Sequence, residues 1–287
     1  MTDRDEGRPI RLVTDRYGKA RIRLVKVLRG PAGDRLRDLT VQVALEGDFD
    51  AAHTEGENRL VVATDTMKNT AYALAIEHLG GSIEAYGQVL ASHFLAFPQV
   101  RRATVTIAEA RWAPIDVGSG PSDHAFIRRG DLTRTAVVTR AADEVSVEAG
   151  VEELTLMMTQ RSAFSGFARD RFTTLAETDD RLMATKVTAA WRYGAADLDH
   201  DALFEAVLAT LLRVFAEHTS PSVQATIWLL GKAVLEEHPE VERIRFALPN
   251  LHHWLVDTAP LGLVNDRSVY VASSEPHGLI EATIGRG

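Results

Sequence analysis

The chain has 287 residues, of which 45% are hydrophobic, and its formal net charge is −8. These values are typical of a globular protein with one or two domains of roughly 100–200 residues each. The acidic balance argues against a surface built to bind nucleic acid or anionic lipid. Because the sequence contains no cysteine, disulfides, thiolate nucleophiles and cysteine-ligated metal sites are excluded.

The first ten residues, MTDRDEGRPI, are charged and lack the apolar core of a signal peptide. No apolar run approaches the roughly 18–20 residues that a membrane span needs. The sequence also does not end in Ser-Lys-Leu, the peroxisomal address. We therefore expect a soluble cytoplasmic protein with neither a membrane nor a nucleic acid as partner.

Similar segments recur along the chain and indicate an internal duplication. In residues 93–112 and again in residues 235–254, an amphipathic helix runs into Pro-x-Val-x-Arg and then into an alternating strand. Two predicted hairpins precede these segments, 21–27 with 39–47 and 134–140 with 154–160. The similar stretches VVATDT (61–66) and LMATKV (182–187) then fall between hairpin and helices in both halves, near the strand-to-helix transition.

The helices are well signalled in both halves. Residues 199–218 place apolar side chains on one face at helical spacing, with Asp199 or Asp201 as the N-cap. The next helix is predicted to start at Ser220-Pro221, because serine caps well and proline suits the first helical position. In the first half, the corresponding helices are predicted at 69–79 and 82–97, separated by two glycines.

This order predicts an α+β fold made of two domains, residues 10–132 and residues 133–287. Each domain has an antiparallel four-stranded sheet with a helix pair on one face. Because open sheets leave unpaired edges, we expect several chains to close into an oligomeric ring. The alternative is a two-domain monomer with charged edges.

Two segments stand out as candidate sites. Thr64-Asp65-Thr66 lies just after an apolar run and before a helix, where a hydroxyl would be exposed and helix N–H groups favour an anion. The alternative is that these side chains merely cap the helix. In LPNLHHWL (248–255), Pro249 is predicted to end the strand and to present Asn250 and His252 at the sheet end, although such a histidine pair can also be structural.

Other common sites are not indicated. The sequence has no HExxH, no phosphate-binding glycine motif and no GxSxG elbow. The adjacent imidazoles of His252 and His253 would point to opposite faces of an extended segment, which argues against a shared metal. The glycine-rich stretch 118–126 is interpreted as a linker between the halves.

Several segments together resemble the urate oxidase (uricase) family, in the family's order and across nearly the whole chain. They are YGKARIRLVKV (17–27), GDFDAAHTEGEN (47–58), VVATDTMKNT (61–70), GFARDRFTTLAETDDRLMAT (166–185), SVQATIW (222–228), LPNLHHWL (248–255) and HGLIEATI (277–284). The resemblance implies two tandem ββααββ "tunnelling-fold" domains and a homotetrameric barrel with active sites between chains. It also implies oxidation of urate by O₂ and water to 5-hydroxyisourate and hydrogen peroxide, with no cofactor and no metal.

The resemblance assigns roles residue by residue. It implies a proton relay of Lys19, Thr64 and His252. The implied substrate-binding residues are Thr64, Asp65 through its N–H, Phe164 by stacking, Arg181 as a two-pronged partner, Val223 through its backbone, Gln224, and Asn250 above the ring where O₂ or water docks.

The chain departs from the family pattern in two places. Leu251 replaces the basic residue expected between Asn250 and His252, and the chain stops soon after IEATI, without the family's longer tail. Two alternatives remain beside urate oxidase: a pterin-type tunnelling-fold enzyme, and a non-catalytic purine- or pterin-binding protein of that fold. Because pterin enzymes generally use a metal or a cysteine, the first is weak for a chain without cysteine.

Overall fold

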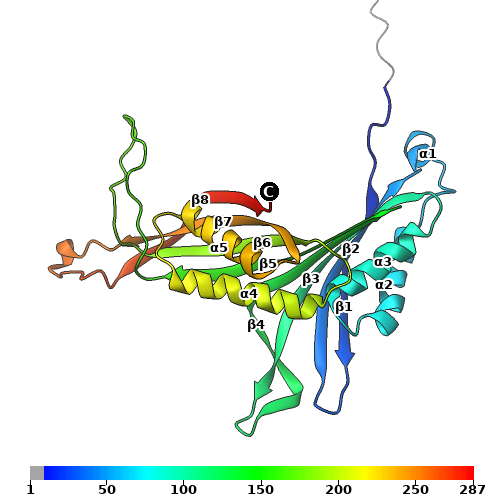
Figure 1. Cartoon of the computed structure of the whole chain (residues 1–287), viewed down its shortest axis with the longest axis horizontal. Coiled ribbons are helices and arrows are strands. Elements are labelled where there is room, and N and C mark those ends of the chain that lie inside the picture. The colour runs from blue at the N-terminus through cyan, green and yellow to red at the C-terminus, as the bar shows by residue number, and fades with distance from the viewer. Residues whose placement is uncertain (1–9) are drawn as a thin grey trace, which may run out of the picture.

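A computed structural model describes residues 10–287 (Figure 1). Eight strands form one antiparallel sheet in chain order: β1 (Tyr17–Leu28), β2 (Arg35–Gly47), β3 (Val100–Asp116), β4 (Pro121–Ala141), β5 (Glu144–Met158), β6 (Met183–Tyr193), β7 (Val241–Leu255) and β8 (Tyr270–Gly285). The helices are α1 (Asp50–Thr54), α2 (Thr64–His78), α3 (Ile83–Leu95), α4 (His200–Glu217), α5 (Val223–Glu237) and the 3₁₀ turn η1 (Ala259–Leu261). Within this range, none of the helices has both the length and the apolar character to cross a membrane.

The predicted fold class is confirmed. Two strands, two helices and two strands follow one another twice along the chain, apart from the short α1 and η1. The two four-stranded units join through β4 and β5 into one continuous sheet, whose long curved shape is visible in Figure 1. The predicted boundary at 132/133 falls inside β4 and stays a prediction.

Both helix pairs cover the same face of the sheet. One row of directly opposed, buried residues crosses seven strands: Val41, Ile107, Ala136, Ala149, Trp191, Ile244 and Ile284. Gly87 of α3 and Gly231 of α5 lie so close to this sheet that an added Cβ would approach side chains of Val138 and Ile284 within 3.0 Å. The helices therefore pack directly on the sheet, while the other face of the sheet carries more polar side chains.

A buried ionic network joins the two halves. Arg134 of β4 bonds to Glu84 of α3 at 2.7 Å and to Asp201 of α4 at 2.6 Å. Arg37 of β2 also reaches Asp201, at 2.6 Å. Burial raises the pKa of Glu84, although the Arg134 guanidinium opposes that shift. Asp201 is the one residue of these contacts that lies beyond β4, so it links two arginines of the first four-stranded unit to the start of α4.

The predicted hairpin of 134–140 with 154–160 is confirmed in its strands, because β4 and β5 form an antiparallel hairpin, but the predicted residues do not pair with each other. Residues 134–140 end β4 and pair with the first part of β5, whereas residues 154–158 pair with β6. The two Ala-Thr stretches are also not at equivalent positions of the repeat: Thr64 opens α2, while Thr185 lies inside β6. The physical reason is a long connection between β5 and β6, which the first half does not have between β1 and β2.

Element boundaries also moved in places. The Asp199 cap of α4 is confirmed by its bond from the Ala202 N–H at 3.1 Å, and Ser82 caps α3. However, α2 begins at Thr64 instead of 69, and Ser222 instead of Ser220 caps α5. Residues 118–126 are not a linker between the halves, because they form the turn from β3 into β4 and the start of β4.

Candidate active site

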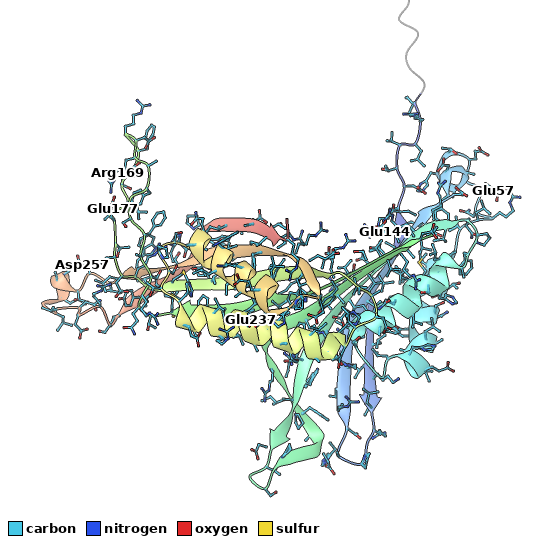
Figure 2. All side chains as sticks on the ribbon, viewed as in Figure 1. Glu57, Glu144, Arg169, Glu177, Glu237 and Asp257 are labelled. Carbon is cyan, nitrogen blue, oxygen red and sulfur yellow. The ribbon has the colours of Figure 1, made fainter. Side chains whose placement is uncertain are left out.

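A cavity of about 680 Å³ lies in the second half, between the β5–β6 connection, the start of α5 and the β7–β8 arm. Six of the predicted site residues line it: Phe164, Arg181, Val223, Gln224, Asn250 and His252. Figure 2 shows the surroundings, with Arg169 and Glu177 on the projecting β5–β6 connection and Asp257 at the tip of the β7–β8 arm. The structure thus brings together residues from three segments that are distant in sequence.

Phe164 and Arg181 form an aromatic and cationic corner of this cavity. The backbone of Phe164 pairs with that of Thr178 in both directions, at 2.8 and 3.0 Å, which fixes the ring on the connection. The Arg181 guanidinium carbon lies 5.2 Å from the centre of the Phe164 ring. Burial lowers the pKa of Arg181, and its Nε finds no hydrogen-bond partner among residues 10–287. A flat anion stacked on Phe164 would supply that missing acceptor.

The first turn of α5 adds hydrogen-bond donors. Ser222 accepts from the Ala225 N–H at 3.2 Å, and the first intrahelical bond runs from Thr226 to Ser222. The N–H groups of Val223 and Gln224 precede that bond and have no intrahelical acceptor, so they can donate to a ligand and favour an anion. This helix start is tied to the Phe164 segment, because the Ala163 N–H donates to the Ser220 carbonyl at 2.7 Å.

Strand β7 contributes Asn250 and His252. The prediction that Pro249 ends this strand was wrong, because β7 continues to Leu255. The strand pairs with β8 on both sides of an irregularity between Asn250 and His252. The His252 ring stacks on Trp254 with centroids 5.2 Å apart. The pKa of His252 is lowered by burial and by the positive charge of Arg181, with smaller contributions from other histidines. Both effects favour the neutral imidazole, which can accept a proton.

The remaining predicted residues lie at the other end of the molecule, on β1 and α2 (Figure 1). Lys19 lines a shallow hollow between β1 and β2. Thr64 is the first residue of α2, and the N-cap position before it is Ala63, which has no side chain that could bond to the helix N–H groups. The interpretation of Thr64 as the cap was therefore wrong. Asp65 bonds to Lys68 and Asn69 instead of the helix backbone. The pKa of Asp65 is lowered, chiefly by its bond to Lys68 and, to a smaller extent, by the positive charge of Lys19.

Sequence reasoning missed several residues of the cavity wall. Trp254, Leu255, Arg267 and Tyr270 line it from the β7–β8 arm. Arg267 donates to the Asp180 carbonyl, next to Arg181, and so holds the end of the β5–β6 connection. No spacing in the sequence pointed to Arg267, because its contact with Asp180 joins two loops that are far apart in sequence and meet only in the folded chain. Among residues 10–287, no group of three metal-binding side chains is found.

Comparison with known proteins agrees with this architecture. A family model described as Uricase matches residues 15–139 and 147–281. The gap between the two matched ranges falls around the turn from β4 to β5. Uricase from Arthrobacter globiformis is 44% identical over 98% of this chain and 91% of its own length. Uricase from Dictyostelium discoideum is 38% identical over 96% of this chain and 97% of its own. The crystal structure of the Arthrobacter protein superposes with a TM-score of 0.93, covering 97% of this chain and 96% of that one.

Proposed function

This chain belongs to the uricase family, and from that premise we propose that it is a urate oxidase. It oxidises urate with O₂ and water to 5-hydroxyisourate and hydrogen peroxide, without a metal or an organic cofactor. The observation that carries this proposal is the cavity in which an aromatic ring, an arginine fork and a helix N-terminus converge. The comparisons give no support to the alternative, a non-catalytic purine- or pterin-binding protein.

The binding half of the site matches the chemistry of urate, a flat heterocyclic anion with alternating donors and acceptors. Phe164 provides a stacking surface and Arg181 a two-pronged donor. Gln224, at the free start of α5, offers an amide that both donates and accepts. Asn250 lines the same cavity and is assigned to the O₂ or water position above the ring.

The catalytic half must make urate electron-rich, because O₂ reacts slowly with closed-shell organic molecules. Removing a second proton from urate does this. We assign that step to Lys19 with the Thr64 hydroxyl, and proton transfer to or from the oxygen species to His252. To accept a proton, Lys19 must be present as the neutral amine. Asp65 contributes a backbone N–H beside Thr64.

We propose a homotetramer in which these two halves meet between chains. Lys19 lies on the first edge strand and His252 on the seventh strand of an open sheet, so one chain keeps them apart. Mixing inactive Lys19→Met chains with inactive Arg181→Gln chains, under conditions that exchange subunits, should restore activity. If the mixture stays inactive although subunit exchange has been demonstrated, both halves of the site lie on one chain.

The experiment that tests the activity is urate consumption, followed by ultraviolet absorbance, in EDTA-treated protein with peroxide quantified alongside. Loss of urate with matching peroxide, unaffected by chelation, is the expected result. Folded protein that binds urate without turnover would instead support the non-catalytic alternative. Location in the cytoplasm stays a prediction from the sequence.

A further inference from the structure

The Tyr17 hydroxyl holds one backbone unit of the segment that leads into α2. The Val62 N–H donates to the hydroxyl oxygen at 2.8 Å, and the hydroxyl donates to the Val62 carbonyl at 3.2 Å. Forty-five positions separate the two residues in sequence. Val62 itself is buried and lies two residues before Thr64. The phenol therefore fixes where the chain enters α2.

Tyr17 also lies two residues before Lys19 on β1. In the β1–β2 pairing, Tyr17 is opposite Leu45 and Lys19 is opposite Val43, and both partners are fully buried beneath the helices. Directly opposed residues share a face of the sheet, so Tyr17 and Lys19 both face the helix layer. One side chain thus bonds the α2 entry while its neighbour on the same face is the proposed base.

The backbone between these two side chains is itself tightly constrained. A Cβ on Gly18 would lie 1.9 Å from the Val43 carbonyl oxygen, so only glycine lets β1 approach β2 this closely. Beyond Lys19 the pairing register shifts before Ile22, and Arg21 adopts a left-handed φ of 57°. Such an irregularity re-aims the strand. From Tyr17 to Lys19, β1 therefore keeps a close and regular pairing with β2.

The phenol ring is fixed as well. Tyr17 packs edge-on against Phe49, with centroids 4.8 Å apart and planes at 85°. Phe49 is buried. Burial raises the pKa of Tyr17, which keeps its hydroxyl protonated and able to donate.

We propose that Tyr17 is a positioning residue that sets the separation between the Lys19 amine and the Thr64 hydroxyl. It does so by connecting β1 to the last residues before α2, and it does not itself contact urate. This inference rests on the proposed function, in which Lys19 and Thr64 act as a pair. Proton transfer between such groups depends steeply on distance, and a misplacement of about 1 Å can cost on the order of 100-fold in rate.

The test is Tyr17→Phe, which removes the hydroxyl but keeps the contact with Phe49. We expect kcat to fall on the order of tenfold while KM for urate changes less than about twofold, because the binding residues lie elsewhere. Tyr86→Phe is the matched control, because the hydroxyl of Tyr86 in α3 also donates to a backbone carbonyl of the α2 region, that of Ala71, at 2.6 Å. That variant should lower the melting temperature and leave kcat unchanged.

A second measurement separates positioning from general loss of structure. If Tyr17 acts through Lys19, adding Tyr17→Phe to a Lys19→Met protein should cause no further loss of the residual rate. Wild-type kcat in Tyr17→Phe would overturn the inference. So would an equal loss of kcat in Tyr86→Phe, or a full further loss in the Lys19→Met background. A wild-type protein without urate turnover would refute the proposed function instead.

Discussion

The two halves of this chain share one plan of strands and helices but build different kinds of site. The second half carries a long β5–β6 connection, which walls a cavity of about 680 Å³ with Phe164 and Arg181. The first half lacks such an insertion between β1 and β2, and Lys19 lines only a shallow hollow. One half therefore has a cavity that could hold a ligand, and the other presents the proposed catalytic groups with little to enclose a substrate.

The helix starts used by the two halves are not equivalent positions of the repeat. The first half uses the first helix of its pair, where Thr64 opens α2. The second half uses the second helix of its pair, where Val223 and Gln224 open α5. On the proposed assignment, divergence after duplication placed the chemistry at different points of the same scaffold. A site assembled from both halves can then combine proton transfer with anion binding, which neither repeat offers alone.

The largest effect should come from Lys19→Met, which tests whether the first half is catalytic. Loss of a proton-transfer group typically costs about 10²–10⁴-fold in rate. We expect a fall of that size in kcat with little change in KM for urate. Lys26→Met is the matched control on the same strand, because Lys26 donates to the Ala75 carbonyl of α2 at 2.7 Å. It should affect stability alone, and a Lys19→Met enzyme with full turnover would remove the assigned division.

Arg134→Met tests whether the two halves depend on each other for stability. Removing one partner of a buried ion pair typically costs about 3–5 kcal/mol, because the remaining charges lose their compensation. Among residues 10–287, buried Glu84 would be left without an ionic partner, whereas Asp201 would keep its bond to Arg37. Denaturant unfolding should show this loss, whereas Arg213→Met should cost far less stability, because solvent screens its exposed pair with Glu237. Similar losses in both variants would contradict a buried joint.

How far the sequence alone leads can be judged from particular elements. The α4 helix and its Asp199 cap were predictable, because periodicity and capping are local signals. The pairing of residues 134–140 was not, since an alternating pattern shows that a strand exists without naming its neighbour. The start of α2 was missed because Thr64 begins the helix without a side-chain cap to mark it.

The site shows the same limit more sharply. No spacing rule connects Phe164, Gln224 and His252, which come from a loop, a helix start and a strand. Their proximity depends on tertiary contacts such as the bond from Ala163 to Ser220. The resemblance to a family supplied these residues, and the fold then showed which of them share a cavity. Arg267 had no such guide and emerged only from the structure.

Arg181→Lys asks whether the second half works by a planar two-pronged contact. Lysine keeps the charge but loses the fork, and hydrogen bonds to charged groups contribute about 1.5–3 kcal/mol. We expect KM for urate to rise roughly 10- to 100-fold, with a smaller change in kcat. Arg161→Lys is a suitable control, because its guanidinium bonds to the Glu217 carbonyl of α4 and does not line the cavity. An unchanged KM in Arg181→Lys would mean that charge alone suffices.

The smallest effect concerns the electrostatics around His252. Its pKa is lowered first by burial, then by Arg181 and, more weakly, by His277 and His253. A relay that needs neutral imidazole is active above this pKa and fails as the pH falls through it. His277→Gln removes one of the positive neighbours, so the pKa of His252 should rise back toward its ordinary value.

The acidic limb of the pH profile of kcat/KM should then move to higher pH in His277→Gln, with the plateau at higher pH unchanged. His124→Gln provides the control, because His124 is exposed at the start of β4 and lines none of the cavity. A limb that moves equally in both variants would reflect net charge and not the local field at His252. A limb that stays in place in His277→Gln would mean that another group sets it.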